Sequence, residues 1–436
     1  MGYSKLVIAI VQLALVPAMA TNWGLPLYGQ WLLLVTIPAF LAAGDLGFGS
    51  AAGYRLIGEV AHRNTDEARI TFQSALAVVL GCSATVLISA PVVIALLPDR
   101  LLAVSGGLNA DETRGVLMVL IVWAVVAIQS NLFIAAMRAH GAFALSASFE
   151  ATVQLVEGLA VIAIVVSGGT PLHAAYGYLA VRTLGVAGHV MLARRGANWL
   201  VLGFEDSRKS RMSELLRPAL AAMLLPFAQA GLLQGTALAV GAAAGAAAVP
   251  IFTSLRTLSR VALQLILIIN VPVLPEFTAE HARGNAAWLN KVVGALTTLN
   301  ALIGALAGFI LAIAGNALLD WWTRGTIEAP QAMIYLTATA LLAGAVWNPL
   351  SYFLLAVNRH EKFAYVFGIA ACTAAILSYA LVRHWGVTGA AAANLVLDLA
   401  MLGFVIVQIR HLTGPFPVGL SAMRFLLAQR RRPIGN

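Results

Sequence analysis

Twelve long runs of mainly apolar residues, separated by short polar connections, constrain this chain more than any other feature of its sequence. A helix needs about 20 apolar residues to cross a bilayer, so twelve helices would occupy roughly 240 positions. The composition agrees, because 60% of the 436 residues are hydrophobic and only 10% are charged. A soluble domain has no interior large enough for this much apolar surface, and we therefore predict an all-α membrane protein. The expected spans are residues 5–21, 29–57, 70–97, 115–136, 146–167, 173–193, 213–241, 249–273, 288–314, 331–356, 363–382 and 388–409.

The positive charges of the connections predict the orientation of the chain. Nineteen of the 27 Lys and Arg residues fall at the N-terminus, in the connections after even-numbered spans or in the tail, against four in the other connections. Cytoplasmic connections are the ones enriched in Lys and Arg. Both termini are therefore expected in the cytoplasm. The formal net charge of +9 follows from this topology, and no nucleic-acid partner is expected.

Two short stretches recur at nearly one spacing, which predicts a duplicated chain. Glu59-Val-Ala-His-Arg-Asn64 matches Glu280-His-Ala-Arg-Gly-Asn285 at a sequence offset of 221, and residues 136–143 match 356–363 at an offset of 220. Chance similarity between basic loops is the alternative. Because each half has an even number of spans, six, the repeat predicts two six-helix lobes related by a pseudo-twofold axis. The expected parts are an N-terminal lobe (1–197), a cytoplasmic linker (198–212), a C-terminal lobe (213–411) and a basic cytoplasmic tail (412–436).

Two arginines inside one apolar run indicate a site for an anion. A charge near the bilayer centre costs about 2.5–3.5 kcal/mol or more unless it faces a partner or a wet cavity. Arg256 and Arg260 are four residues apart, on one face of the eighth span, where their guanidinium groups repel each other. Phosphate and pyrophosphate accept the bidentate hydrogen bonds of Arg, so we predict that this pair binds substrate. The alternative is a structural pair held by helix ends or by Asp45.

Four other charges inside the spans are candidates for ion coupling or charge relay: Asp45, Glu157, Arg182 and Asp398. Glu157 and Arg182 fall near the middle of consecutive antiparallel spans, where they either neutralise each other or take part in proton or ion coupling. Asp398 has no obvious partner, and an unpaired carboxylate in a membrane is often protonated or linked to an ion.

Arg55 and Glu276 are equivalent under the same offset of 221. A twofold axis would place them opposite each other near the cytoplasmic mouth of the cleft, and we predict that they form a gate. The alternative is that Arg55 pairs with Glu59, four residues further along the same helix.

No pattern typical of catalysis, metal binding or a cofactor is evident. Cys82 and Cys372 each fall within an apolar run, without a CxxC motif. The glycine-rich stretch Gly47-Phe-Gly49-Ser-Ala-Ala-Gly53 lacks the preceding strand and the later acidic residue of a dinucleotide loop. We therefore expect no enzyme, no cofactor and no metal site.

The chain resembles the polysaccharide flippases of the multidrug/oligosaccharidyl-lipid/polysaccharide exporter superfamily, above all the O-antigen and capsule-type transporters. The residues that carry the resemblance are Tyr28-Gly-Gln-Trp31, Asp45-Leu-Gly-Phe-Gly49 and Arg55, together with the twelve spans. The resemblance implies a bacterial inner-membrane carrier that moves a polyprenyl-pyrophosphate-linked oligosaccharide from the inner to the outer leaflet. It also implies two V-shaped lobes around a central cationic cavity, with Arg55, Arg256 and Arg260 as cations of that cavity. Membrane lipid, a polysaccharide polymerase and a chain-length regulator would be its partners.

Three other functions compete with this one. A drug or organic-cation antiporter of the same superfamily should have an acidic or aromatic pocket, whereas arginines at least match the acids in these spans. A membrane glycosyltransferase or polymerase needs a catalytic carboxylate in a sizeable loop, and none is evident. A scaffold for polysaccharide assembly would not transport at all.

Overall fold

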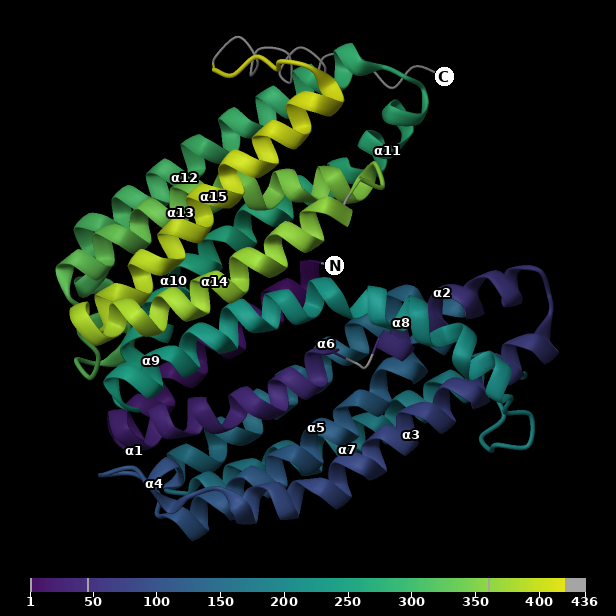
Figure 1. Cartoon of the computed structure of the whole chain (residues 1–436), viewed down its shortest axis with the longest axis horizontal. Helices are drawn as coiled ribbons and strands as arrows, with labels where there is room; N and C mark the ends of the chain where they lie inside the picture. The colour runs from purple at the N-terminus through teal and green to yellow at the C-terminus, as the bar shows by residue number, and fades with distance from the viewer. Residues whose placement is uncertain (1, 45–46, 360, 420–436) are drawn as a thin grey trace. The chain divides into compact units, whose positions relative to one another are not determined.

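In a computed structural model, residues 2–44, 47–359 and 361–419 are described, and every regular element among them is a helix (Figure 1). Ten helical stretches in this part of the chain are long and apolar enough to cross a membrane. Two more complete the predicted twelve. One arises because α1 (Gly2–Gly44) is two helices that meet at a kink at Gly24, and the other is α7 (Pro171–Gly196), 26 residues long with Arg182 in its interior. The prediction of an all-α membrane protein is confirmed.

The described chain forms two compact units. The N-terminal unit runs to Gly241 and includes Gly245–Pro250, and the C-terminal unit contains Ala242–Ala244 and the chain from Ile251 onward. Besides α1 and α7, the first unit contains α2 (Phe48–Ala61), α3 (Thr65–Leu96), α4 (Asp99–Leu102), α5 (Ala110–Ala139), α6 (Phe143–Val166), α8 (Lys209–Ala230), a π-helical turn (Gly231–Gly235) and most of α9 (Thr236–Ala244). The second contains most of α10 (Ala248–Asn270), a 3-10 turn (Val271–Val273), α11 (Leu274–Ala282), α12 (Ala286–Thr323), α13 (Gln331–Ala356), α14 (Glu361–Trp385) and α15 (Val387–Thr413).

α8 belongs to the N-terminal unit, although the repeat assigns it to the second lobe. It packs on α1, α2 and α3 of that unit. The predicted lobe boundaries, the pseudo-twofold axis and the central cavity stay predictions.

Backbone geometry recurs along the chain at the predicted offset of 221. Gly24 has φ 71° and ψ 169°, and its equivalent Gly245 has φ 85° and ψ 166°. This conformation is accessible to glycine and strained for other residues, so each glycine allows one long helix to end and the next to begin. Asn64 and Asn285 are equivalent in the same way, and each caps the following helix by accepting a hydrogen bond from a backbone N–H three residues on.

The match between residues 136–143 and 356–363 has the wrong register, because the structure does not relate these segments by an offset of 220. α5 ends at Ala139 and α13 at Ala356, so the equivalent helix ends are related by an offset of 217 instead of 220. The first residues of the two helices, Ala110 and Gln331, keep the offset of 221, but α13 is shorter, at 26 residues against 30. The shorter helix shifts the basic connections that follow it.

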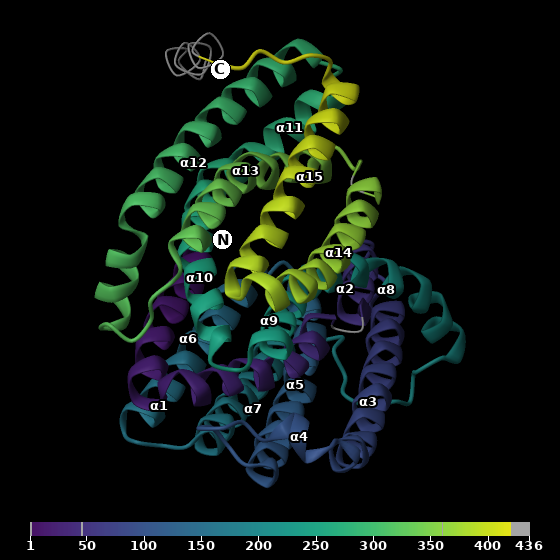
Figure 2. The ribbon, with the colours of Figure 1, turned by 60° about the vertical axis from the view of Figure 1, so that its left-hand side comes forward.

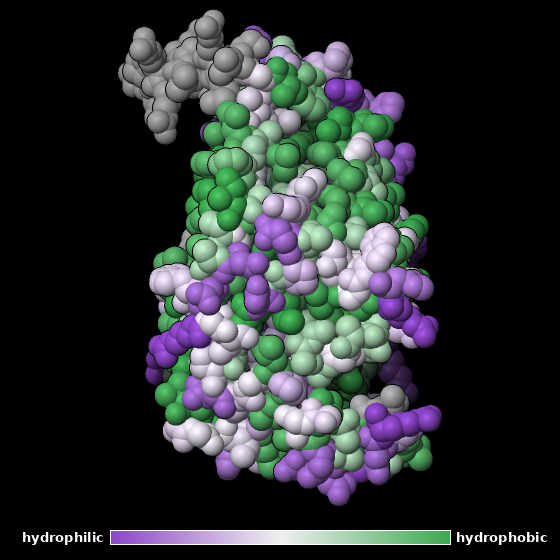
Figure 3. Space-filling view, turned by 90° about the vertical axis from the view of Figure 1, so that its left-hand side faces the viewer, coloured by the Kyte–Doolittle hydropathy of each residue, from purple (hydrophilic) through white to green (hydrophobic). Residues whose placement is uncertain are grey.

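α12 shows how one helix can face lipid and protein at once. Leu306, Phe309 and Ile313 on one side are 62%, 64% and 71% exposed, as expected for lipid-facing side chains. On the other side, a Cβ atom at Gly304 would lie 2.5 Å from Ala345 of α13, so glycine allows the two helices to approach closely. α12, α13 and α15 lie side by side (Figure 2). Hydrophobic residues also cover broad areas of the face in Figure 3.

Candidate functional site

The predicted arginine pair lies on a polar stripe of α10. Arg256, Thr257, Arg260 and Gln264 lie three, four, seven and eleven residues after Thr253, which places all five side chains on one face of the helix. Both arginines are partly buried, and the guanidinium carbon of Arg256 lies 5.0 Å from the centre of the Phe252 ring.

Arg260 makes no hydrogen bond or salt bridge within the part of the chain that the structure describes. Asp45, the alternative partner considered for this pair, lies outside the described residues. The predicted role of Asp45 in coupling therefore stays a prediction. An anion is the ligand that this face of α10 can bind, because guanidinium groups donate paired hydrogen bonds and the nearby hydroxyl and amide groups add further donors.

Glu157 of α6 and Arg182 of α7 form a buried salt bridge, which confirms that they neutralise each other. Arg182 donates to Glu157 Oε1 at 2.8 Å from Nε and to Oε2 at 2.5 Å from Nη2. Trp123 of α5 donates its indole N–H to the same carboxylate at 2.9 Å. Both charged side chains are almost fully buried. A role for the pair in coupling stays a prediction.

Two further members of this cluster were missed from the sequence. Arg182 Nη1 also donates to Glu150 Oε1 and Oε2, at 3.0 and 3.2 Å. His189 Nε2 lies 3.7 Å from Glu150 Oε2. A spacing of seven residues in the sequence could have revealed them. Glu150 and Glu157 are seven residues apart, and so are Arg182 and His189, so each pair lies on one helix face.

Asp398 of α15 accepts a hydrogen bond from Trp347 Nε1 of α13 at 2.8 Å. Among the described residues, no cation forms a salt bridge with it. A Cβ atom at Gly344 would lie 3.6 Å from Asp398 Oδ1 and 3.7 Å from Leu263, so α10 passes α13 and α15 beside this carboxylate. The aromatic rings of Phe363 and Phe367 surround Trp347, with ring centres 6.3 and 5.9 Å away.

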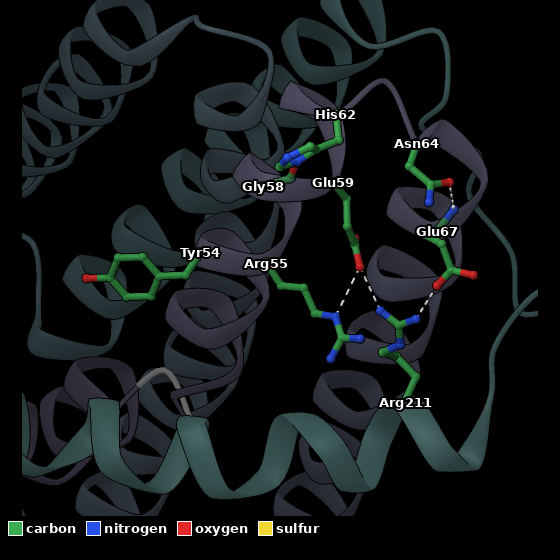
Figure 4. A pocket seen from close by; sticks show the side chains of 8 residues that line it. All are labelled: Tyr54, Arg55, Gly58, Glu59, His62, Asn64, Glu67 and Arg211. Atoms are coloured by element: carbon green, nitrogen blue, oxygen red, sulfur yellow. Dashed lines mark hydrogen bonds and ion pairs between the residues drawn. The ribbon is translucent and has the colours of Figure 1, made fainter.

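Arg55 lies in an ion-pair cluster at the junction of α2, α3 and α8 (Figure 4). Its Nε donates to Glu59 at 3.0 Å and its Nη1 lies 2.8 Å from Glu214, which confirms the alternative that it pairs with Glu59. Arg211 donates to Glu59 at 2.7 Å and also binds Glu67. Figure 4 shows the guanidinium groups of both arginines directed at the same carboxylate oxygen of Glu59.

These side chains line an open pocket of about 510 Å³, bordered by Tyr54, Gly58, His62 and Asn64. Since carboxylates already bind both arginines, the pocket offers little unpaired positive charge. Glu276, the predicted gate partner of Arg55, lies on α11 six residues before its end, just as Arg55 lies six residues before the end of α2. The substrate-binding and gate roles of Arg55 and Glu276 stay predictions.

No family model and no curated protein match this sequence. Solved structures do match its fold. An inward-facing multidrug resistance MATE family transporter of the MOP superfamily is 16% identical and gives a TM-score of 0.71 over 93% of this chain and 98% of that one. The lipid II flippase MurJ in an inward closed conformation is 8% identical, with a TM-score of 0.74 over 99% and 93%. A MOP superfamily transporter from Pyrococcus furiosus, described as having a binding pocket of reverse polarity, is 15% identical, with 0.63 over 94% of each chain.

The chain therefore has the fold shared by these membrane transporters along almost its whole length. The low identities mean that the likeness describes the fold alone. One fold here serves a multidrug transporter and a lipid flippase, so any argument about the substrate has to come from the residues of this chain.

Proposed function

We propose that this protein is a transporter that moves a polyprenyl-pyrophosphate-linked oligosaccharide from the cytoplasmic to the outer leaflet by alternating access. The observation that carries the proposal is the arginine pair on α10, one turn apart on a polar stripe of an otherwise apolar helix. Two guanidinium groups in a membrane are stabilised by an anion with several oxygens, and a pyrophosphate is such an anion.

The chemistry of this substrate matches the fold. Its sugar head cannot cross hydrocarbon unaided, its pyrophosphate needs a cationic site, and its polyprenyl tail can remain in the lipid. A two-lobed carrier that opens alternately to each side supplies a polar route for the head beside the lipid. A lipid II flippase has the same fold, so the fold is compatible with a lipid-linked substrate.

The setting follows from the sequence. We place the chain in a bacterial inner membrane with both termini in the cytoplasm, because Lys and Arg gather on that side. A polysaccharide polymerase and a chain-length regulator would act on the product after it reaches the outer leaflet. The chain itself would perform no covalent chemistry.

Reconstituted vesicles test the proposal. The purified chain is placed in liposomes with a fluorescent polyprenyl-pyrophosphate oligosaccharide, and an added quencher reports how much substrate has changed leaflet. The double variant Arg256→Ala/Arg260→Ala should lose at least about tenfold in rate, since each lost charged hydrogen bond is worth about 1.5–3 kcal/mol. Arg256→Lys should retain part of the rate, because Lys keeps the charge but lacks the planar fork.

Arg383→Ala is the matched control. Arg383 lies in the C-terminal unit, 5.6 Å from the Tyr379 ring, which is similar to the contact of Arg256 with Phe252, but it is exposed near the end of α14. This variant should transport at the wild-type rate. A wild-type rate for the double alanine variant would refute the role of the α10 pair in binding pyrophosphate.

A drug or organic-cation antiporter is the second candidate, and one observation favours it. Asp398 lies beside Trp347 and two phenylalanines without a cationic side chain bound to it in the described residues, and a carboxylate next to aromatic rings suits an organic cation. Uptake of a fluorescent organic cation by the same vesicles distinguishes the two functions. Uptake that Asp398→Asn abolishes and the double alanine variant retains would favour the antiporter.

A further inference from the structure

Glu150 and His189 form an ionisable pair that the proposed substrate site does not use. The His189 side chain is fully buried, and Glu150 is 23% exposed. Their closest atoms, His189 Nε2 and Glu150 Oε2, are 3.7 Å apart, and Gln154 donates to the other carboxylate oxygen at 2.9 Å. The ring of Phe149 packs edge-on against the imidazole, with ring centres 4.8 Å apart.

The hydrogen bond on the other ring nitrogen fixes the tautomer of His189. Its Nδ1 lies 3.0 Å from the backbone oxygen of Gly185. A carbonyl oxygen only accepts, so Nδ1 carries a hydrogen and donates it. Nε2 has no hydrogen-bond partner within the described residues. In a neutral imidazole, Nε2 would therefore direct a lone pair toward a carboxylate, and a proton on either group would replace this repulsion with an attraction.

Within the described residues, the charges of the cluster leave one carboxylate without a counter-charge. Arg182 binds both Glu150 and Glu157, so one guanidinium faces two carboxylates. A proton on His189 or Glu150 makes the cluster neutral. An uncompensated buried charge is unfavourable in a membrane, so binding of this proton is energetically favourable.

No other helix packed on the cluster supplies the missing charge within the described residues. α5 contributes the indole of Trp123, and its stretch from 115 to 137 contains no ionisable residue. α1 contains no charged residue from 6 to 44, and the side chain of Lys5 lies outside the described part of the chain. Tyr3 and Ser4 form hydrogen bonds with Thr152 and Ala147 of α6. α7 adds Tyr178, which stacks on Trp31 of α1.

We propose that His189 and Glu150 form a proton-binding site that couples transport to proton movement. A proton from water binds Nε2 of His189, giving an imidazolium paired with the Glu150 carboxylate, and leaves from the same atom. The coupling rests on the proposed transport function, whereas the proton site itself does not.

Glu150 and His189 lie between the cytoplasmic ends of their helices and the buried salt bridge of Glu157 and Arg182. Glu150 lies seven residues after the first residue of α6, and His189 seven before the last residue of α7, so both are nearer the end of these helices that we place in the cytoplasm. Glu157 and Arg182 are seven residues deeper, about 10 Å at 1.5 Å per residue. A proton bound at His189 thus changes the charge next to a salt bridge in the middle of the membrane.

Nitrogen NMR of the full chain in lipid nanodiscs tests the proton site without any substrate. With histidines labelled by nitrogen-15, His189 Nε2 should change from unprotonated to protonated as the pH is lowered through about 8 to 5. The signal is assigned by its loss in His189→Gln, or by its contact with Phe149 if that variant does not fold. Glu150→Gln should move the midpoint to lower pH by at least one unit, because the carboxylate that stabilises the imidazolium is gone.

His173→Gln is the control, since His173 is an exposed residue at the start of the same helix. It should leave the His189 midpoint unchanged. A His189 ring that keeps one protonation state across this range, or a midpoint that Glu150→Gln does not move, would overturn the proton site.

A pH difference across the vesicle membrane tests the coupling. It should accelerate wild-type and His173→Gln transport several-fold and leave the rates of His189→Gln and Glu150→Gln unchanged. A wild-type transport rate that does not change with the pH difference would overturn the proposed coupling. Failure of the wild type to move any lipid-linked oligosaccharide would instead count against the proposed function, and the NMR titration would still decide the proton site.

Discussion

Trp347 of α13 donates its indole N–H to the Asp398 carboxylate of α15 across 2.8 Å, joining two helices of the C-terminal unit. Trp123 of α5 donates in the same way to Glu157 of α6, at 2.9 Å. The first residues of α5 and α13 are related by the offset of 221, so these helices are equivalent in the repeat. Each half of the chain therefore has one carboxylate held by an indole, but in the described residues only Glu157 also has an arginine.

Arg182 of α7 and Asp398 of α15 occupy corresponding positions in the two halves of the chain. Arg182 lies eleven residues after Pro171, the first residue of α7, and Asp398 lies eleven residues after Val387, the first residue of α15. The N-terminal unit thus has a base where the C-terminal unit has an acid. This difference makes the first unit nearly neutral at that level and leaves the second with a single carboxylate that has to bind a proton, a cation or a polar donor.

The first prediction separates the charge of Asp398 from its hydrogen bond. Asp398→Asn should unfold close to the wild-type temperature, because the amide oxygen still accepts from Trp347. Asp398→Leu leaves that buried N–H without an acceptor and should cost about 1–3 kcal/mol. Thermal unfolding in detergent measures both. Transport lost in Asp398→Asn despite normal unfolding would show that the charge itself is used, whereas equal destabilisation by Asn and Leu would contradict the hydrogen-bond assignment.

The second prediction concerns the salt bridge between Glu157 and Arg182. Arg182→Met leaves two carboxylates close together without a counter-charge and should cost about 3–5 kcal/mol. Adding Glu157→Gln should recover at least half of this loss, because one of the buried charges is then removed. Chemical unfolding of the single and double variants gives the interaction energy. Additive losses would mean that the two side chains stabilise the fold independently.

The third prediction concerns the attachment of α8 to the N-terminal unit. Arg211 is only 11% exposed and binds Glu59, Glu67 and the hydroxyl of Thr71, so Arg211→Met should cost about 2–4 kcal/mol. Arg217 is exposed on the same helix and has no salt bridge within the described residues, so Arg217→Met should be neutral. Unfolding temperatures compare the two. Equal effects would show that charge alone, rather than the Arg211 contacts, secures α8.

The helical fold and the pairing of buried charges could be predicted from the sequence, because a membrane allows few backbone conformations and disfavours unpaired charges. Apolar runs of sufficient length can only be helices there, and opposite charges on consecutive antiparallel spans have a strong reason to meet. Glu157 and Arg182 follow that logic. Arg256 and Arg260 share a face because helical periodicity alone places them there.

The remaining contacts depend on distances that no local pattern contains. Glu150 and His189 lie within about two turns of helix ends, where charges are common, so neither stood out from the sequence. Arg211 was counted among the basic residues of a linker, although its partner Glu67 is 144 residues away in the chain. The break between residues 21 and 29 was predicted, but the sequence did not show that α1 continues on both sides of it, with a kink at Gly24 alone.

The fourth prediction is the membrane topology. Reporter fusions at Gly106 and Trp322 should report the outer side, and a fusion at Ser207 the cytoplasm, because the connections rich in Lys and Arg stay inside. Gly106 lies between α4 and α5, and Ser207 lies between α7 and α8. Reporter enzyme activity in whole cells provides the measurement. A cytoplasmic signal at Gly106 would invalidate the orientation on which the proposed direction of transport depends.

The fifth prediction is the gate between Arg55 and Glu276, each six residues before the end of its helix. Such a pair in a partly wet site is worth about 1 kcal/mol, enough to bias two states several-fold. Arg55→Glu or Glu276→Arg alone should slow flipping in the vesicle assay, and the double swap should restore part of the rate. Arg55 already binds Glu59 and Glu214, so Glu214→Gln is the control for those contacts. It should slow flipping less than Glu276→Arg does. A double swap no faster than either single variant would mean that the two residues never pair during transport.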